Sequence, residues 1–324
     1  MIPLARTLTF ILLVVTSLSA EVEKVKILGV GNSFTNNANK YLAKIYDSVD
    51  TADADIGTAF IGGCSLDRHV KHAKEHEANP QTGNQYQYRK DWELVGKNVS
   101  LKEMLLDEDW DYITIQQVST KSYKEGTFYP YTQELIDYIR QYRPDAEIVV
   151  HETWSHSVNS YRAKDWKLDP DEMYQKLHAN YHKIADEHGL RVIPVGTAFQ
   201  NARATEMWDY QVNDFDPKDN DLIYPEDKNN LPDMSKSLNN DYYWKKNKEG
   251  TWEVRSDGFH ANTAGEYLGA LVWFEFFSGV DARTVPYKPD SLSEAQAESL
   301  RIIAHETVVA EKAASAQPAE AAAM

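Results

Sequence analysis

Cysteine is nearly absent from this sequence, since Cys64 is the only one among 324 residues. A single thiol cannot form an intramolecular disulfide, so the chain is not a scaffold held together by such bonds. Its stability must come from a hydrophobic core, and a chain of this length can bury one. We therefore expect one large domain without a long linker.

Positive charge is also scarce. Lysine and arginine together number 34, against 50 aspartate and glutamate residues, and the formal net charge is -16 at pH 7. A surface with this charge repels nucleic acid and anionic membranes, so neither is expected as a partner. A neutral or cationic small molecule suits the composition better.

No apolar run in the sequence is clearly as long as a membrane span, although one lies near the start of the chain. Arg6 precedes the apolar run from Leu8 to Val15, and small residues follow from Thr16 to Ala20. This layout is typical of a signal peptide, and the run is short for a membrane span. We predict a signal peptide at residues 1–20 and a periplasmic or secreted bacterial protein that leaves the membrane after cleavage. A membrane anchor is the alternative.

Residues 21–309 alternate between short β-type runs and longer amphipathic stretches, as in a parallel sheet with crossover helices. The clearest predicted helices are Tyr131 to Tyr142, which carries three aliphatic side chains on one stripe, and Asp171 to His188. The predicted strands are Val25 to Val30, Ile56 to Phe60, Asp111 to Gln117, Ala146 to His151 and Arg191 to Val195.

Two segments interrupt this alternation. Residues 203–255 are polar, acidic and rich in aromatic side chains, and we interpret them as a long insertion over the edge of the sheet. Residues 310–324 are rich in alanine, which predicts a frayed helix end and a disordered tail.

Small polar residues follow the first predicted strand, in Gly31-Asn32-Ser33-Phe34-Thr35. Ser33 therefore lies at the carboxyl edge of the sheet, where ligands of open α/β sheets gather. A helix that starts just after it offers free backbone N–H groups to a developing negative charge. The alternative is a plain turn and helix cap. A dinucleotide-binding loop is excluded at Phe34, where its third glycine would stand.

A nucleophilic serine needs a base that is itself oriented by a partner. Among the ten histidines, His260 is the only one with an acidic residue three positions before it, and that residue is Asp257. One loop can present both groups, with the carboxylate holding the imidazole in the tautomer that accepts a proton from Ser33. Taken alone, the pair could equally be a capping aspartate beside a surface histidine.

As a set, these blocks resemble the SGNH (GDSL-like) serine hydrolases. Gly31-Asn32-Ser33 is similar to their first block, with Asn32 in place of the usual aspartate, and Asp257-x-x-His260 is similar to their last block. Gly62-Gly63-Cys64-Ser65-Leu66 resembles the second block, whose glycine donates a backbone N–H to the oxyanion. The third block departs from the pattern, because Ile115-Gln116-Gln117-Val118-Ser119 stands where many members have Gly-x-Asn-Asp.

The Gln-Gln-x-Ser form, together with Gly196-Thr197-Ala198-Phe199-Gln200, resembles a bacterial branch of this superfamily known as a domain of unknown function. The resemblance runs from about Val25 to Val280. It implies a three-layer, flavodoxin-like α/β fold with about five parallel strands and helices on both faces. It also implies ester hydrolysis through an acyl-enzyme, with no metal and no organic cofactor.

The resemblance assigns roles to particular residues. Ser33 is the expected nucleophile, His260 its base and Asp257 the orienting carboxylate. The oxyanion would be bound by the backbone N–H groups of Ser33 and Gly63 and by a glutamine amide. Both Gln116 and Gln117 are candidates for that amide, and Gln117 is slightly preferred because it lies nearer the place of the usual motif.

Further residues are candidates for substrate contacts. They are Asn32, His69, which leads out of the edge beside the glycine block, and Trp154, which is either a platform for a sugar ring or ordinary packing. His69, His72 and His76 share one helical face, but no carboxylate pattern completes a metal site there. His178 and His182 are one turn apart and are expected on a solvated helix face.

The leading interpretation of the sequence is a secreted esterase that removes acetyl or similar groups from a carbohydrate. It depends on the predicted export, the superfamily resemblance and the aromatic insertion. One alternative is an esterase or thioesterase acting on lipids, although the insertion is too polar for an apolar lid. The other is a glycan-binding protein without catalytic activity on a hydrolase fold.

Overall fold

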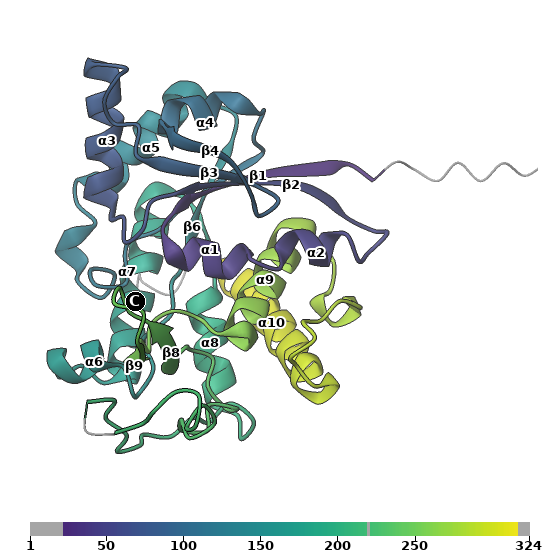
Figure 1. The fold of residues 1–324 in the computed structure, drawn as a ribbon. Helices are drawn as coiled ribbons and strands as arrows, with labels where there is room; N and C mark the ends of the chain where they lie inside the picture. The colour runs from purple at the N-terminus through teal and green to yellow at the C-terminus, as the bar shows by residue number, and fades with distance from the viewer. Residues whose placement is uncertain (1–21, 219–220, 317–324) are drawn as a thin grey trace, which may run out of the picture.

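The computed structural model describes residues 22–218 and 221–316. The predicted signal peptide and most of the predicted tail therefore lie outside the described residues. The centre is a seven-stranded sheet in the order β4-β3-β2-β1-β5-β6-β7 (Figure 1). Its strands are β1 Lys24–Gly31, β2 Asp53–Phe60, β3 Tyr86–Lys90, β4 Glu93–Val99, β5 Tyr112–Ile115, β6 Glu147–His151 and β7 Arg191–Ile193.

Helices cover both faces of the sheet, so the fold is a three-layer α/β sandwich. The helices of the first layer are α1 Ser33–Asn39, α2 Leu42–Tyr46, α8 Val195–Arg203, α9 Thr263–Ser278 and α10 Glu294–Ser315. Those of the second layer are α3 Leu66–Ala78, α4 Leu101–Asp107, α5 Tyr131–Tyr142 and α7 Pro170–His188. A short helix α6, Tyr161–Trp166, and two single turns, η1 Glu125–Thr127 and η2 Ala282–Thr284, lie in the connections.

Alternation along the strands divides the core between the two layers. In β1, Ile27 packs into the first cluster and Leu28 into the second, and in β6 Val149 and Val150 divide in the same way. Successive side chains of a strand point to opposite faces, so a strand buried on both sides becomes a continuous apolar run. This is the pattern from which these strands were predicted.

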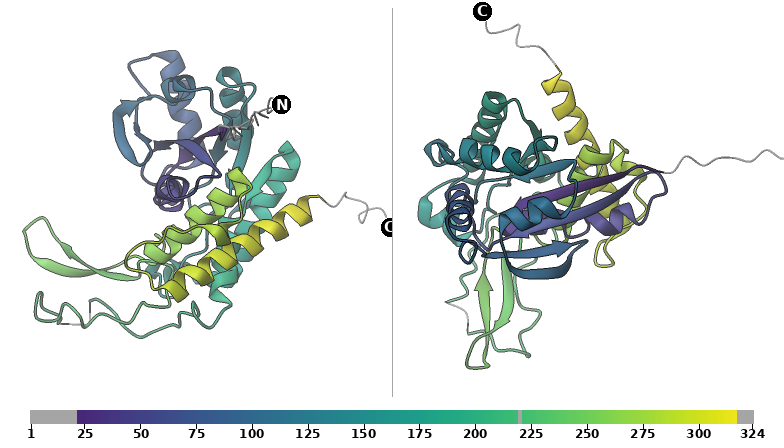
Figure 2. Two further views of the ribbon diagram at one scale, coloured as in Figure 1. Left: turned by 90° about the vertical axis from the view of Figure 1, so that its right-hand side faces the viewer. Right: turned by 90° about the horizontal axis from the view of Figure 1, so that it is seen from above.

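The local sequence explains where the longer helices begin and end. The Asp169 carboxylate caps α7 and Pro170 occupies its first turn, whereas Gly189 ends it in a left-handed conformation. In α9 every residue from Ala264 to Phe277 is buried. A helix that is apolar on all sides must lie in the core, and α9 is accordingly packed between the sheet, α1 and α10 (Figures 1 and 2).

The sheet differs from the expected one of about five parallel strands. The pairs β1–β2, β1–β5, β5–β6 and β6–β7 are parallel, but β3 and β4 add an antiparallel hairpin at one edge. Asp91 and Trp92 form its turn with positive φ angles of 47° and 72°. The hairpin was missed because its outer strand is charged and largely exposed, so it lacks the apolar run of a central strand.

The polar segment after α8 is largely irregular, as predicted for an insertion, but it also contains a two-stranded antiparallel hairpin. This hairpin consists of β8 Tyr242–Lys246 and β9 Trp252–Ser256. It projects from the body of the molecule beside the long loop that precedes it (Figure 2). At the other end of the chain, α10 extends through Ser315, so residues 310–315 are helical rather than part of a disordered tail.

None of the helices in the described ranges is both long and apolar enough to span a membrane. The carboxyl ends of β1, β2, β5 and β6 lie at one edge of the sheet, because these strands are parallel. The connections that leave this edge carry the residues considered next.

Candidate active site

Ser33 is the first residue of α1, directly after the carboxyl end of β1. Asn32 caps this helix by accepting a hydrogen bond from the Phe34 N–H at 3.0 Å. The backbone at Gly31 has no room for a side chain, since a Cβ there would lie 2.1 Å from the Thr35 hydroxyl oxygen. This tight turn from strand to helix presents the Ser33 side chain at the sheet edge with its own backbone N–H free of helical bonds.

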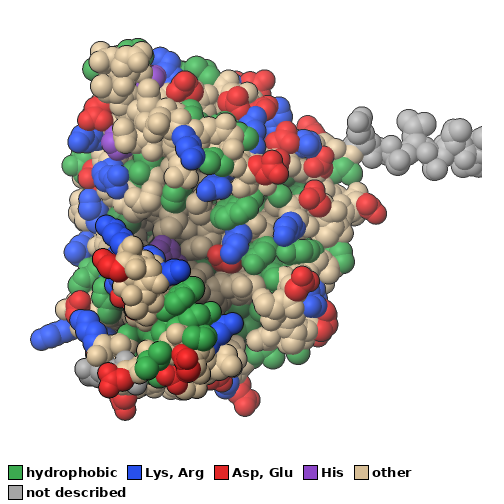
Figure 3. Space-filling view, in the orientation of Figure 1, with side chains coloured by type: hydrophobic (Ala, Val, Ile, Leu, Met, Phe, Trp, Pro, Cys, Tyr) green, Lys and Arg blue, Asp and Glu red, His purple; other side chains and the backbone are tan. Residues whose placement is uncertain are grey.

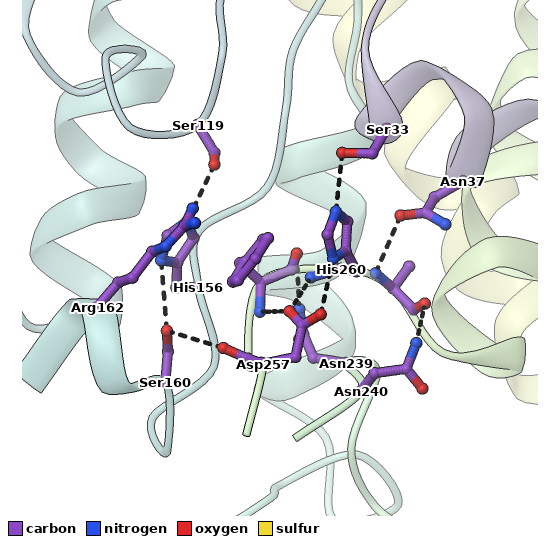
Figure 4. Close-up of polar contacts among 12 residues, drawn as sticks. Ser33, Asn37, Ser119, His156, Ser160, Arg162, Asn239, Asn240, Asp257 and His260 are labelled. Carbon is purple, nitrogen blue, oxygen red and sulfur yellow. Dashed lines mark hydrogen bonds and ion pairs between the residues drawn. The ribbon is translucent and has the colours of Figure 1, made fainter. Parts of the chain in front are cut away.

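His260 and Asp257 lie in the loop that follows β9. The Asp257 Oδ2 atom accepts a hydrogen bond from His260 Nδ1 at 2.7 Å, and His260 Nε2 lies 2.8 Å from the Ser33 hydroxyl oxygen (Figure 4). The second carboxylate oxygen accepts from the backbone N–H groups of Phe259 and His260, each at 2.9 Å. Asp257 is therefore held by its own loop while it orients the imidazole.

The tight course of this loop depends on Gly258. Its φ angle is +76°, and a Cβ would lie 2.5 Å from the Ser160 Cα atom. Any other residue would strain the backbone and collide with the neighbouring loop. The glycine thus allows the segment after β9 to approach residue 160 and to turn His260 toward α1.

Electrostatics define the protonation state of the acidic partner. Burial disfavours the charged form of Asp257, but the hydrogen bonds and the charge of His260 outweigh it and hold the pKa of Asp257 below its ordinary value. An ionised Asp257 can only accept, so His260 Nδ1 donates to it. The lone pair of Nε2 is then directed at the Ser33 hydroxyl.

The loop between β2 and α3 supplies the candidate oxyanion donor Gly63. It is attached to the end of β1, because Ile61 N–H donates to the Gly31 carbonyl and the Asn32 side chain donates to the Cys64 carbonyl. Gly63 is exposed, has a φ angle of +58° and has open space at its Cβ position. Among the described residues, the N–H groups of Gly63 and Ser33 have no side-chain acceptor. They also have no backbone acceptor apart from any bond within a helix or strand. Both amides remain available to a developing oxyanion.

The two glutamines after β5 point to different layers. Gln117 accepts from Leu66 N–H and donates to the Thr127 carbonyl, so its amide is engaged between α3 and η1. The bonds of Gln117, the slightly preferred candidate for the oxyanion donor, thus run to α3 and η1. Gln116 faces the Ser33 turn instead, where it donates to Asn32 Oδ1 and accepts from the Thr35 hydroxyl, both at 2.8 Å. Alternation along the strand decides this difference.

Three residues predicted to contact substrate are structural. Asn32 is fully buried in the helix cap described above, and His69 is 1% exposed, with Nδ1 bonded to the Tyr86 hydroxyl at 2.7 Å. Trp154 is completely buried and is stacked between Phe34 and Phe199, at 4.3 and 4.6 Å between ring centroids. Trp154 therefore packs in the core and is not exposed to a sugar ring. Its ring supports Phe34, the residue next to Ser33.

The other histidines considered in the sequence each have their own contacts. His72 contacts Glu75 and His76 contacts Asn84, so these side chains and that of His69 have separate partners. His178 and His182 were expected on a solvated helix face, and both side chains are partly exposed. Both contact glutamates from other elements, and each side chain is less than half exposed.

A second serine and histidine pair, not recognised in the sequence, lies beside the first (Figure 4). His156 Nε2 is 3.1 Å from the Ser119 hydroxyl, and its other ring nitrogen is 3.5 Å from the Ser160 hydroxyl. Ser160 also donates to the backbone carbonyl of Asp257. Burial lowers the pKa of His156 to about 3, with a further contribution from two nearby arginines, so its ring is neutral. The polar segment after β6 was the only sequence signal for this network.

The surface around these groups is hollowed. Figure 3 shows a depression with a histidine in it, between α1 and the β8–β9 hairpin of Figure 1. A cleft of about 810 Å³ lies nearby, and its walls include Asn159, Tyr161, Trp252 and Ser256. Ser256 directly precedes Asp257, so the wall of this cleft continues into the loop that carries Asp257 and His260.

Chemically, the arrangement provides a hydroxyl, an imidazole aligned with it, a carboxylate behind the imidazole, and two free backbone amides. These are the parts that acyl transfer through a covalent intermediate requires. Within the described ranges, two groups of histidine and acidic side chains have the spacing of metal ligands. Neither group includes Ser33, Asp257 or His260.

Comparison with known proteins adds a family. Residues 26–221 match the family model described as a domain of unknown function, DUF4886. The crystal structure of a DUF4886 family protein from Bacteroides uniformis is similar over 89% of this chain and 95% of its own, with 27% identity and a TM-score of 0.68. No curated protein matches the chain.

Weaker similarity extends to two further structures. One is a proposed SGNH hydrolase from Slackia heliotrinireducens, with 19% identity and a TM-score of 0.46 over 78% of this chain and 98% of its own. The other is a proposed GDSL-like lipase from Parabacteroides merdae, with 15% identity and a TM-score of 0.42 over 80% of this chain and 98% of its own. The assignment of chemistry therefore depends on the geometry of the site.

Proposed function

The chain belongs to the DUF4886 family, a domain of unknown function, and on that premise we propose that it is a serine esterase with Ser33 as its nucleophile. The observation that carries this proposal is the continuous line of hydrogen bonds from Ser33 through His260 to Asp257, at 2.8 and 2.7 Å. The alternative of a helix cap beside a surface histidine does not require the Ser33 hydroxyl, the His260 imidazole and the buried Asp257 carboxylate to be hydrogen-bonded in series.

In the proposed mechanism, Ser33 Oγ adds to the ester carbonyl while its proton passes to His260 Nε2. Asp257 stabilises the imidazolium that forms and remains ionised itself. The oxyanion is bound by the N–H groups of Ser33 and Gly63. His260 then gives its proton to the leaving alcohol, and the resulting acyl-enzyme is hydrolysed by a water molecule that His260 activates in the same way.

A covalent probe distinguishes the two serine and histidine pairs. We expect a fluorophosphonate to label wild-type protein at Ser33, and Ser33→Ala to abolish both labelling and hydrolysis of a chromogenic acetate. Ser119→Ala is the matched control, because it removes the other serine that contacts a histidine. If labelling persists in Ser33→Ala and disappears in Ser119→Ala, the nucleophile is Ser119 of the second pair.

For the substrate, we propose an acetylated or similarly acylated carbohydrate. Support comes from aromatic side chains around the cleft, since Tyr161 and Trp252 line it and are 43% and 39% exposed. Trp252 also stacks on Tyr224 at 4.3 Å, which fixes its ring. Rigid exposed aromatic faces bind the apolar faces of sugar rings at low entropic cost. Export, as predicted from residues 1–20, would bring the enzyme to such polymers.

The test of the substrate class compares two ester substrates in one variant. Trp252→Ala is expected to weaken hydrolysis of an acetylated oligosaccharide and to leave a small acetate unaffected, because remote contacts bind the sugar and not the reacting carbonyl. Tyr129→Ala is a control, as Tyr129 is similarly exposed but lies before α5. Preference for long-chain acyl esters over acetylated glycans would favour the lipid alternative, and saturable glycan binding without hydrolysis would favour a binding protein.

A further inference from the structure

Two histidines and two glutamates converge on the side of the molecule where α7 meets α8 and α10. His178 and His182 are one turn apart on α7, Glu152 follows β6, and Glu311 comes from α10. His178 Nδ1 is 2.7 Å from Glu152 Oε1, and His182 Nε2 is 3.3 Å from both carboxylate oxygens of Glu311. Three segments that are distant in the sequence thus bring potential ligand atoms together.

The orientation of His182 is fixed by its own helix. Its Nδ1 atom lies 3.0 Å from the backbone carbonyl of His178. Because a carbonyl only accepts, Nδ1 must carry a proton, and Nε2 is the nitrogen that faces Glu311. A lone pair on Nε2 would be repelled by two carboxylate oxygens unless a proton or a metal cation lay between them. A second ring nitrogen bonded to a backbone carbonyl is also the usual support of a metal-binding histidine.

Glu152 is held as a metal-binding carboxylate would be. Its side chain is completely buried, and its Oε2 atom accepts from both the N–H and the hydroxyl of Thr197, at 2.7 and 2.9 Å. This leaves Oε1 directed at His178. The close approach of α8 depends on Gly196, where a Cβ would lie 2.2 Å from the Thr153 carbonyl oxygen and 3.1 Å from Glu152 Oε2.

From this geometry we propose that Glu152, His178, His182 and Glu311 bind one zinc ion. Ligand atoms of Glu152, His178 and His182 already lie within 4.8 Å of one another, and Glu311 borders His182. Zinc binds nitrogen and carboxylate oxygen at about 2.0–2.2 Å in a tetrahedron, so the three ligand atoms must draw closer together and Glu311, which is not part of the 4.8 Å group, must turn toward the ion. Two imidazoles favour zinc over calcium or magnesium, which prefer oxygen. Zinc replaces the protons held between each histidine and its glutamate.

The proposed ion is structural and acts apart from the ester chemistry. It would join the end of β6 to α7 and α10. Trp154 lies two residues after Glu152 and stacks on Phe34, the neighbour of Ser33. The proposal does not depend on the esterase proposal, because its ligands include none of the residues assigned to hydrolysis.

The other group with metal-ligand spacing serves as a comparison. His305 lies 2.9 Å from Glu275 and 3.2 Å from Asp281, so this group has a single nitrogen ligand. Its carboxylates are already engaged, because Asp281 is paired with Arg283 and Glu275 accepts from the Ala282 N–H. A variant at His305 therefore removes a part-buried contact between a histidine and a glutamate without touching the proposed site.

The experiment measures zinc itself. The full chain is stripped with a chelator and titrated with ZnCl₂ by calorimetry, and bound metal is counted by elemental analysis after dialysis. We expect one zinc per chain in wild type and in His305→Ala, and loss of stoichiometric binding in His182→Ala and Glu152→Gln. Cobalt(II) should give the visible absorption of a tetrahedral site in the same two zinc-binding proteins.

A milder variant keeps the test decisive if a ligand variant fails to fold. Thr197→Val leaves all four ligands in place and removes only the hydroxyl that orients Glu152, so it should weaken zinc affinity about 10- to 100-fold. The proposal is overturned if wild type takes up no stoichiometric zinc, or if folded His182→Ala binds it as wild type does. Equal losses in His182→Ala and His305→Ala would also overturn it.

Discussion

Replacing Asp257 with asparagine is the sharpest test of the proposed relay. Asparagine keeps the oxygen that accepts from the backbone N–H groups of Phe259 and His260. The new amide N–H would, however, face His260 Nδ1, where the carboxylate now accepts at 2.7 Å. The imidazole must then adopt the other tautomer, with its proton on Nε2 directed at Ser33. That nitrogen can no longer accept the hydroxyl proton.

The expected loss in turnover is about 10⁴-fold, or roughly 5.5 kcal/mol of transition-state stabilisation. The fold should survive, since one hydrogen bond to a charged group contributes about 1.5–3 kcal/mol. Turnover of a chromogenic acetate and the rate of fluorophosphonate labelling should fall together. Asp241→Asn is the control, because Asp241 is a neighbouring buried carboxylate that bonds to Ser237 rather than to His260. Turnover within tenfold of wild type in folded Asp257→Asn would refute the reasoning.

Three further predictions concern the surroundings of the site. Gln116→Ala should lower turnover at least about tenfold and destabilise the fold by about 1–3 kcal/mol, because it leaves the buried Thr35 hydroxyl without its acceptor and removes one of the two donors to Asn32 Oδ1; steady-state kinetics and urea unfolding would detect this, and wild-type values in both would contradict it. Trp154→Ala should reduce the free energy of unfolding by about 3–5 kcal/mol, because it empties a site stacked on two rings, and a loss below about 1 kcal/mol would argue against this packing role. The third concerns three fully buried histidines whose pKa burial lowers from 6.5 to about 3. In this pH range each of these histidines is protonated in the unfolded chain and neutral in the folded chain. Each should therefore lower the free energy of unfolding by about 1.4 kcal/mol per pH unit as the pH falls from about 6.5 toward 3. A free energy of unfolding that stays constant over this interval would contradict the prediction. They are His69, His151 and His156.

Local sequence patterns predicted much of the fold. The strands β1, β2, β5, β6 and β7 and the helices α5 and α7 all lie where apolar runs and stripes indicated, with ends that differ by a few residues. Such elements are predictable because burial on one stripe or on both faces leaves a period in the sequence. The β3–β4 hairpin was missed because an exposed edge strand can be polar and charged.

The sequence by itself therefore determined the α/β architecture, and it singled out Ser33 with the Asp257 and His260 pair as the groups to examine. Motif spacing within a single loop, as in Asp257-x-x-His260, carries this information.

Only the tertiary structure decided which side chains face each other. It turned Gln116 toward the Ser33 turn and Gln117 away, and it buried Trp154 between two rings. It also placed His178 and His182 against glutamates that are 26 and 129 residues away in the chain. Such approaches leave no local period, because they arise when separately formed elements pack their apolar faces together. A polar residue on one element then meets whatever polar residue the packing of another element brings to it.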